Sequence, residues 1–434
     1  MGLFRNIILT MKKGKQKILF FIFLLIFLIV APILVLYAQG YRFDLRGRKI
    51  TQTGGIFIKA TPRQAQIYLD NKLVKTTDFL FGSALIENLL PQKHHIVIQK
   101  EGFYSWEKNL ETKEKEVTEA RNIILFPKDS YYRSLAQDVE QFWFSPDGRT
   151  IVLKESKQDS WALKLYNLER NVKSHIISED DLSPKGAVLS EVDFSDKQRE
   201  IILEVAIAEQ LKYFSSDISG TAPLLEEINP PPETPSNVVA LFDFQEKRYY
   251  LDIFGYIYQT DEAFSTKQKL NSQPFPIKHE TEYKLYVFSE WIFVQERDTL
   301  YLFNQETQSF EKFFEGVSSL KISPNLNKLL YFSQNEIWIL FLNKQGSQPK
   351  REKGERVFLL RLSEKIKDVF WIRPEYLIFN TKSDTKIIET DNRDRTNIVH
   401  WAEFKDSEIF WNQYDKSLYV LDKGNLLVSE KLIQ

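Results

Sequence analysis

The chain has 434 residues, which is too long for one ordinary domain and predicts two or three folded units. Lys and Arg number 58 against 59 Asp and Glu, and the resulting net charge of −1 excludes the basic surface that nonspecific nucleic-acid binding requires. There is no cysteine, which excludes disulfides, thiolate catalysis, cysteine-based zinc sites and the lipidated cysteine of a bacterial lipoprotein. Hydrophobic residues make up 43% of the chain and aromatic residues 14%, so most of it is expected to fold.

The first element in chain order is an uncharged apolar run from Ile18 to Tyr37. At about 1.5 Å per residue it would span roughly 30 Å, the hydrocarbon thickness of a bilayer. A soluble helix seldom avoids polar residues on every face for five turns, so residues 18–37 are predicted to form a transmembrane helix. Pro32 lies near the far end, where a kink is tolerated.

The residues before this run carry five positive charges and no acidic side chain, at Arg5, Lys12, Lys13, Lys15 and Lys17. The rest of the chain has a net charge of −6. The positive-inside rule therefore predicts a cytoplasmic tail at 1–17, a linker at 38–53 and an extracytoplasmic location for everything after Tyr37. A cleaved signal peptide remains an alternative, because Ala38-Gln39-Gly40 is similar to a cleavage site, and it would also export the bulk of the protein.

Residues 54–128 change to the short alternating runs of β-strands. The run that ends at Leu69 is followed by Asp70-Asn71, a pair that tolerates positive φ and predicts a hairpin. A later strand is expected over His95–Lys100, a charged turn over Glu111–Glu119 and a last strand over Ala120–Phe126.

This segment resembles the PEGA domain, a small β-sandwich module of envelope proteins. The matching motifs are Gly55-Ile56-Phe57-Ile58, Thr61-Pro62 with Ala65, Ile67-Tyr68-Leu69-Asp70, Ile86-Glu87-Asn88-Leu89-Leu90-Pro91, His95-Ile96-Val97-Ile98 and Gly102-Phe103 with Trp106. The signature tetrad itself departs from the family as Pro62-Arg63-Gln64-Ala65, and Asn71 and Gln92 replace residues usual in its turns. The resemblance implies a cell-surface interaction or spacer module and no enzyme.

The remaining residues, 129–434, contain a recurrent unit of an apolar run, a polar turn and a second apolar run. The clearest copies are Phe142 to Leu153 and Leu320 to Phe332, and weaker ones begin near Val192-Asp193-Phe194-Ser195-Asp196, Leu241-Phe242-Asp243-Phe244, Val287-Phe288-Ser289, Val369-Phe370-Trp371-Ile372 and Ile409-Phe410-Trp411. The spacing of about 43 residues predicts a β-propeller of about seven blades, and six or eight would also fit. An array of β-sandwiches is the alternative. Phe144-Ser145-Pro146-Asp147-Gly148 resembles the blade turn of TolB-like and WD40-like propellers.

Two segments interrupt the pattern. Ser215–Asn237 contains Asn229-Pro230-Pro231-Pro232-Glu233-Thr234-Pro235, which cannot occupy the centre of a sheet and predicts a surface loop, with a partner-binding polyproline as the alternative. Lys350–Arg356 has mixed charges and is expected to form a solvated hairpin tip.

No catalytic, cofactor-binding or metal-binding residue is predicted. The histidines, His94, His95, His175, His279 and His400, have no metal-site spacing and are expected to be neutral surface residues. No nucleophile elbow, phosphate loop or calcium loop occurs, and Asp180-Asp181 is an adjacency that chance explains. Seven tryptophans could stack on sugars but are expected to fill the wedges between blades: Trp143, Trp161, Trp291, Trp338, Trp371, Trp401 and Trp411.

These features together predict a membrane-anchored extracytoplasmic envelope protein. Its role is expected to be non-catalytic, with the propeller binding a protein or glycan partner. A propeller-type hydrolase or lyase acting on envelope polysaccharide is the alternative, and it would need converging carboxylates at the axis. A structural spacer without a specific ligand is a third possibility.

Overall fold

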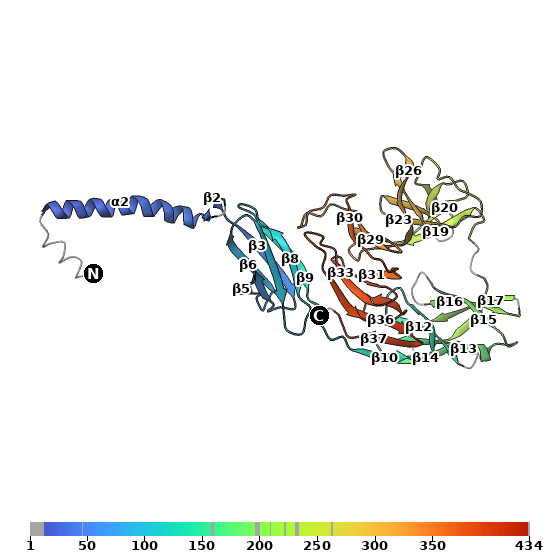
Figure 1. Ribbon diagram of the computed structural model, residues 1–434. Coiled ribbons are helices and arrows are strands. Elements are labelled where there is room, and N and C mark those ends of the chain that lie inside the picture. Colours follow the sequence, from blue (N-terminus) through green and yellow to red (C-terminus); the bar gives the residue numbers. More distant parts are fainter. Residues whose placement is uncertain are drawn as a thin grey trace. The chain divides into compact units, whose positions relative to one another are not determined.

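The structure is a computed structural model that describes residues 13–45, 47–157, 160–195, 200–208, 210–220, 223–230, 234–261 and 264–432. The chain divides into two compact units. Unit 1 comprises residues 1–125 with the short segments Ser347–Pro349 and Arg393–Arg395, and unit 2 comprises the remainder. Figure 1 shows the long helix α2 of unit 1 in blue and the strands of unit 2 in green to red.

The helix α2 runs from Lys13 to Ala38 and contains Pro32. Its part from Lys17 to Ala38 is long and apolar enough to cross a membrane, and none of that window is buried against the protein. The expected helix is therefore present, and it begins before Ile18, within the basic segment. Arg5 and Lys12 lie outside the described residues.

After α2, the described residues of unit 1 form nine strands in three sheets. The hairpin β1-β2 is followed by a three-stranded sheet, β6-β3-β9, and a four-stranded sheet, β5-β4-β7-β8. The strands are β1 Tyr41–Asp44, β2 Lys49–Gln52, β3 Gly54–Thr61, β4 Gln66–Leu69, β5 Lys72–Thr76, β6 Ser83–Leu89, β7 Lys93–Gln99, β8 Trp106–Glu111 and β9 Val117–Ile124. One hydrophobic core joins the two larger sheets, with Ile56, Ile67, Ile98 and Trp106 among its buried members.

The turn at Asp70-Asn71 has the conformation that the sequence predicts. Both residues have positive φ, 48° and 68°, and they connect the antiparallel pair β4-β5. The charged turn after β8 is shorter than expected, because β9 begins at Val117 and pairs in parallel with β3. That pairing aligns Ile56 and Ile58 with Thr118 and Ala120, and a parallel partner that is distant in sequence leaves no local signal.

The described residues of unit 2 form seven four-stranded antiparallel sheets, numbered here in chain order. Sheet 1 contains β11 Val139–Phe144, β12 Thr150–Lys157, β13 Ser160–Asn167 and β14 Val172–Ser178; sheet 2 contains β15 Val188–Phe194, β16 Glu200–Ile207, β17 Gln210–Asp217 and β18 Leu225–Ile228. Sheet 3 contains β19 Val238–Phe244, β20 Lys247–Asp252, β21 Ile257–Thr260 and β22 Lys267–Lys269; sheet 4 contains β23 Tyr283–Phe288, β24 Trp291–Glu296, β25 Thr299–Asn304 and β26 Ser309–Glu315.

Sheet 5 contains β27 Val317–Ile322, β28 Lys328–Ser333, β29 Glu336–Phe341 and β30 Arg356–Arg361; sheet 6 contains β31 Asp368–Arg373, β32 Tyr376–Asn380, β33 Thr385–Glu389 and β34 Ile398–Ala402. Sheet 7 contains β35 Glu408–Asn412, β36 Ser417–Asp422 and β37 Asn425–Ser429, and its fourth strand is β10 Tyr132–Ala136 from the beginning of the unit. A short 3-10 helix, η1, spans Glu179–Asp181. Successive four-stranded meanders closed by a strand from the other end of the unit are typical of a β-propeller.

Every copy of the sequence repeat falls on the first strand of a different sheet: β11, β15, β19, β23, β27, β31 and β35. The two clearest copies share a turn geometry as well. In sheet 1, the Ser145 hydroxyl accepts a hydrogen bond from Thr150 N at 3.0 Å and donates to Asp147 at 2.6 Å. In sheet 5, Ser323 makes the same pair of bonds to Lys328 N and Asn325. The repeated Ser-Pro-Asp/Asn sequence is therefore a local device that closes the first hairpin of a sheet.

Neighbouring sheets pack through shared apolar cores. Separate clusters of buried side chains join sheets 7 and 1, 1 and 2, 3 and 4, 4 and 5, and 5 and 6. Sheets 6 and 7 meet through Phe370 and Phe410, whose ring centroids lie 5.5 Å apart, and through a hydrogen bond of 2.9 Å from Trp401 Nε1 to the Tyr132 hydroxyl. A two-faced sheet cannot bury both faces alone, which is why each one needs its neighbours.

Two sequence expectations about interruptions were wrong in part. Ser215–Asn237 is not one loop, because β17 continues to Asp217 and β18 pairs with it. Pro231, Pro232 and Glu233 of the proline run lie outside the described residues. The segment at Lys350–Arg356 is not fully solvated either. The Arg351 side chain is only 14% exposed and pairs with Glu355 at 2.6 Å, since it folds back on its own sheet.

Candidate functional site

A cavity of about 690 Å³ opens in unit 2 between sheets 4 and 5. It lies where the link from β26 to β27, the turn from β28 to β29 and the end of β30 meet. Its lining comprises Asp298, Phe314, Glu315, Gly316, Val317, Ser318, Ser333, Gln334, Asn335, Glu336, Arg361, Leu362 and Ser363. Hydroxyls, amides and charged groups dominate this set, so the cavity offers hydrogen bonds more than apolar contact.

Glu336 is the best-fixed charged group in the cavity. Its carboxylate accepts hydrogen bonds from Trp338 Nε1 at 2.8 Å and from Arg361 Nε at 2.6 Å. The bond from Trp338, more than the pairing with Arg361, lowers the pKa of Glu336 and keeps it anionic. The Arg361 side chain is 72% exposed, whereas that of Glu336 is 16% exposed. The pair therefore presents a guanidinium at the mouth and holds a carboxylate beneath it.

The carboxylates Asp298, Glu315 and Glu336 face one guanidinium in the lining, so the cavity is acidic. Glu315 also pairs with Lys312 at 2.9 Å, outside the lining. The turn that carries Gln334 and Asn335 is held in place because Asn335 Nδ2 donates to Leu362 O at 3.0 Å. A fixed turn with exposed amides and carboxylates suits recognition of a ligand that offers hydrogen-bond donors or positive charge.

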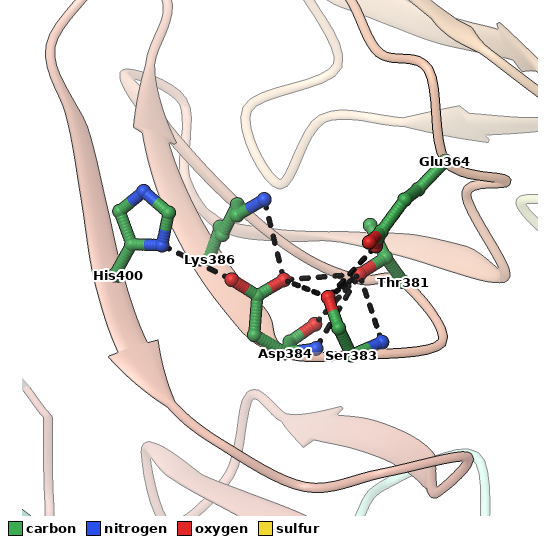
Figure 2. Close-up of polar contacts among 6 residues, drawn as sticks. All are labelled: Glu364, Thr381, Ser383, Asp384, Lys386 and His400. Carbon is green, nitrogen blue, oxygen red and sulfur yellow. Dashed lines mark hydrogen bonds and ion pairs between the residues drawn. The ribbon is translucent and has the colours of Figure 1, made fainter.

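A second polar cluster follows the cavity directly in the chain, where Glu364 comes after Ser363 (Figure 2). Asp384 is its centre, with partners Thr381 at 2.9 Å, Lys386 at 3.2 Å and His400 at 3.0 Å. Burial by itself raises the pKa of Asp384, but the bonds from Thr381, Lys386 and His400 outweigh it and the net pKa is lowered. Asp384 is thus an ionised carboxylate whose charge and hydrogen-bond acceptors are already paired with its neighbours.

This cluster contains serine, histidine and aspartate, but it is not arranged as a nucleophilic triad. Ser383 Oγ donates to Glu364 at 2.7 Å, and His400 contacts Asp384 through Nδ1. Figure 2 shows His400 and Ser383 on opposite sides of Asp384, so the imidazole is not placed to take the serine proton. Its geometry is that of a structural network at the β32-β33 turn.

The histidines are partly as expected. His175 and His400 are surface residues paired with Asp181 and Asp384. His94 is not at the surface, because its side chain is only 4% exposed and its ring nitrogens lie 2.9 Å from Asp70 and 3.0 Å from Leu90 O. Among the residues that the structure describes, no group of three or more His, Asp or Glu side chains is arranged to hold a metal ion.

The tryptophans of unit 2 lie mainly inside the packing. Trp161, Trp371, Trp401 and Trp411 are buried, and Trp143, Trp291 and Trp338 are half-buried. Several donate their indole N–H within the protein: Trp161 to Ala187 O at 2.7 Å, and Trp371 to Lys321 O at 2.9 Å. Buried rings that are already hydrogen-bonded are not stacking platforms for a sugar. They serve as wedges between sheets.

Lys328 is an ionisable group that the sequence did not single out. It is 4% exposed, and its ammonium donates to Pro374 O at 2.7 Å between sheets 5 and 6. Desolvation lowers its pKa to about 8, against an ordinary 10.5; Glu375 and Asp391 oppose the shift, and Arg351 adds to it. A pattern of apolar residues before and after it gives no sign that a lysine in a strand will be buried.

This burial predicts a pH-dependent stability. The unfolded chain binds more protons than the folded one between pH 8 and 10.5, so the contribution of Lys328 rises with pH in that window. Relative to Lys328→Met, the free energy of unfolding of the natural chain is expected to increase by about 2 kcal/mol between pH 7 and 9.5. Urea unfolding at the two pH values measures this. Lys344→Met, at a largely exposed lysine, is the control, and an equal pH response in all three proteins would contradict the assignment.

No family model and no curated protein matches the chain. Solved structures do show similarity to it. A chain of a mitotic checkpoint complex matches at 9% identity and a TM-score of 0.45, covering 71% of this chain and 95% of that one. YCF48 from Cyanidioschyzon merolae matches at 11% identity and a TM-score of 0.43, covering 69% and 98%. The β-propeller domain of Cps50 (Swd1) from Myceliophteria thermophila matches at 11% identity and a TM-score of 0.37, covering 70% and 98%. The propeller-like architecture of unit 2 rests on its own sheet order.

Proposed function

We propose that the chain is a single-pass membrane protein with a cytoplasmic N-terminus and an extracytoplasmic bulk. In this proposal its role is non-catalytic, as a binding or scaffold protein of the cell envelope for a protein or glycan partner. The apolar helix α2, with no part of its membrane-length window buried, supports the anchor. The charge asymmetry around it supports the orientation.

The domain assignment belongs to the same proposal. The seven sheets of unit 2 are taken as the seven blades of one propeller, and the two larger sheets of unit 1 as a PEGA-like sandwich. In this proposal the sandwich is the interaction or spacer module that the PEGA resemblance implies. The partner-binding role falls to unit 2.

The observation that carries the binding role is the acidic cavity between sheets 4 and 5. Its polar groups are held by Trp338, Arg361 and Leu362, so little ordering is needed when a partner binds. An excess of carboxylates favours a partner surface with hydrogen-bond donors or basic groups. The edge of the cavity carries Gln334, which is exposed and available for contact.

A photo-crosslinking amino acid at Gln334, in the full chain in its own membrane, tests this proposal. The matched control is the same crosslinker at the exposed Lys344. Lys344 comes two residues after Leu342, whose backbone N–H donates to Asn327 O just before β28 begins, whereas Gln334 follows the end of β28. We expect a discrete adduct at position 334 and none at 344. Asp298→Asn with Glu315→Gln is expected to weaken the adduct about tenfold, as the loss of roughly 1.4 kcal/mol of electrostatic attraction would.

The alternative, a hydrolase or lyase acting on envelope polysaccharide, is favoured by the presence of three carboxylates in one cavity. A glycosidase needs one carboxylic acid whose pKa is raised, and Glu336 has a lowered pKa instead. Turnover of a glycan panel that Glu336→Gln abolishes would establish the enzyme and reject the scaffold role. Equal labelling at positions 334 and 344 without turnover would remove this cavity as the binding site.

A further inference from the structure

The hairpin β1-β2 exposes large apolar side chains immediately after the membrane helix. Phe43 is 57% exposed, Ile50 is 61% exposed and Leu45 at the turn is 81% exposed. Phe43 and Ile50 are direct cross-strand partners, so their side chains lie on the same face of the hairpin. An apolar pair that is exposed to water does not stabilise a two-stranded hairpin. Such a pair indicates that a lipid or protein surface covers this face of the hairpin.

The other face of the hairpin is already occupied by the sandwich. Arg42 and Thr51 are the next cross-strand pair, and they point to the opposite face. Arg42 Nη2 donates to Asn88 Oδ1 at 2.9 Å, and the hydroxyl of buried Thr51 donates to Glu114. The polar face of the hairpin is therefore fixed on unit 1, which leaves Phe43 and Ile50 facing outward.

Arg42 also ties the hairpin to the end of α2. Its Nη1 donates to Tyr37 O at 2.7 Å, and its guanidinium lies 3.5 Å from the centroid of the Tyr37 ring. Tyr37 is the penultimate residue of the helix. Phe43 follows Arg42 directly, so it lies within about 10 Å of the helix end, given the length of an arginine side chain and a Cα spacing of about 3.8 Å.

The charges around the exposed pair suit an anionic surface. Arg48 and Lys49 are both exposed and precede Ile50 directly, while Asp44 is the one acidic residue of the hairpin strands. Basic residues flanking aromatic and aliphatic side chains are the composition of segments that lie in the headgroup region of a bilayer. Each basic group near an anionic membrane contributes about 1 kcal/mol of attraction.

We infer that the hairpin β1-β2 is an interfacial membrane anchor. Phe43, Leu45 and Ile50 enter the headgroup region of the leaflet where α2 ends, and Arg48 and Lys49 contact anionic lipid headgroups. This inference rests on the proposed membrane anchoring by α2. Its consequence is mechanical: two contacts with the bilayer restrict the tilt of the sandwich, which a single flexible linker would leave free.

Exposed apolar residues elsewhere in unit 1 do not satisfy the same conditions. Phe79, Leu80 and Phe81 are 55% to 70% exposed on a turn that the Asp78 carboxylate holds through Leu80 N, Phe81 N and Ser83. That turn lies beside Ser83, which pairs with Lys59 near the far end of β3. The hairpin β1-β2 leads into the other end of β3, at Gly54. Five residues of β3, about 17 Å, separate Gly54 from Lys59. Phe81 is therefore a matched exposed apolar site away from the helix.

The absence of cysteine makes a direct test possible, because one introduced cysteine is labelled alone. Leu45→Cys and Ile50→Cys, with Phe81→Cys as control, each carry an NBD fluorophore in the full chain reconstituted into vesicles containing anionic phospholipid. We expect headgroup spin-labelled lipid to quench most of the emission at positions 45 and 50 and to leave position 81 unquenched. Arg48→Gln with Lys49→Gln, or vesicles of neutral lipid alone, are expected to reduce the quenching.

Protease added to the same vesicles tests the membrane anchoring by α2 separately from the lipid contact of the hairpin. If a fragment containing α2 is protected and labels 45 and 50 are as unquenched as label 81, the hairpin inference is overturned and the anchor stands. If α2 is not protected, both fail. If labels 45 and 50 are shielded from aqueous iodide in native membranes but not in pure-lipid vesicles, a protein covers the hairpin and the lipid contact is rejected.

Discussion

A chain that ends at Gly424 is expected to lose the cooperative thermal unfolding of unit 2. The truncation removes β37, which lies between β36 and β10 and supplies every backbone pairing that holds β10 in sheet 7. Leu426 is fully buried and Val428 is 4% exposed, both in the core shared by sheets 7 and 1. Each buried side chain contributes about 2–5 kcal/mol and the two strand ladders add to this, so the loss is comparable with the roughly 5 to 15 kcal/mol that stabilises a typical domain. Differential scanning calorimetry measures the transition.

Single substitutions separate closure from side-chain packing in this strand. Leu426→Ala leaves the ladders intact and is expected to cost about 2–5 kcal/mol through the cavity it creates. Leu427→Ala, at a half-buried neighbour on the opposite face, is expected to cost clearly less. A truncated chain that unfolds with the midpoint of the full chain would show that the pairing of β10 with β37 in sheet 7 contributes nothing to stability.

Alanine in place of Gly255 is expected to destabilise unit 2 by about 2–5 kcal/mol. Gly255 has φ of +83° in the turn between β20 and β21, a region that costs other residues about 1–2 kcal/mol. A Cβ there would lie 1.9 Å from Phe275 O and 2.7 Å from Phe275 N, both backbone atoms that cannot swing aside. Phe275 N donates to Gly255 O at 2.8 Å. The clash therefore also breaks the hydrogen bond that holds Phe275 in the hydrophobic core.

Gly186 provides the control for the backbone contribution. Its φ is +93°, but no atom lies within 4 Å of the place a Cβ would occupy. Gly186→Ala is therefore expected to cost only the conformational part, about 1–2 kcal/mol. Denaturant unfolding of both variants gives the comparison. Equal losses at the two positions would show that the contact with Phe275 relaxes without cost and would contradict the argument from packing.

The elements that sequence reasoning predicted well are those with a local physical signal. The apolar helix α2 follows from one uninterrupted apolar run, and the Asp70-Asn71 turn follows from two residues that tolerate positive φ. The seven repeat copies mark the first strand of each sheet because each copy places an apolar run directly before the polar turn that leads into the second strand. Outer strands such as β18 and β22 are short or polar, and they escaped detection because they lack such a run.

The candidate site could not be predicted in this way. Glu336, Trp338 and Arg361 form one charged unit in the cavity, yet two of them lie on β29 and the third comes from the end of β30, beyond a long connection. The pairing of His94 likewise depends on Asp70, which lies 24 residues earlier in the chain. A hydrogen-bond partner is a property of three-dimensional neighbours, and residue type alone does not indicate which neighbours a side chain will have.

The sequence by itself therefore determined the order of parts: an apolar helix, a short β-rich segment and a repeat array, since each is specified by periodicity within a window of a few residues. The tertiary structure decided what those parts enclose. It alone closes sheet 7 with β10 from the beginning of unit 2, pairs β9 with β3 in parallel, and places carboxylates from several turns around one cavity. These features depend on long-range pairing, whose entropy cost is repaid only when the whole unit has folded.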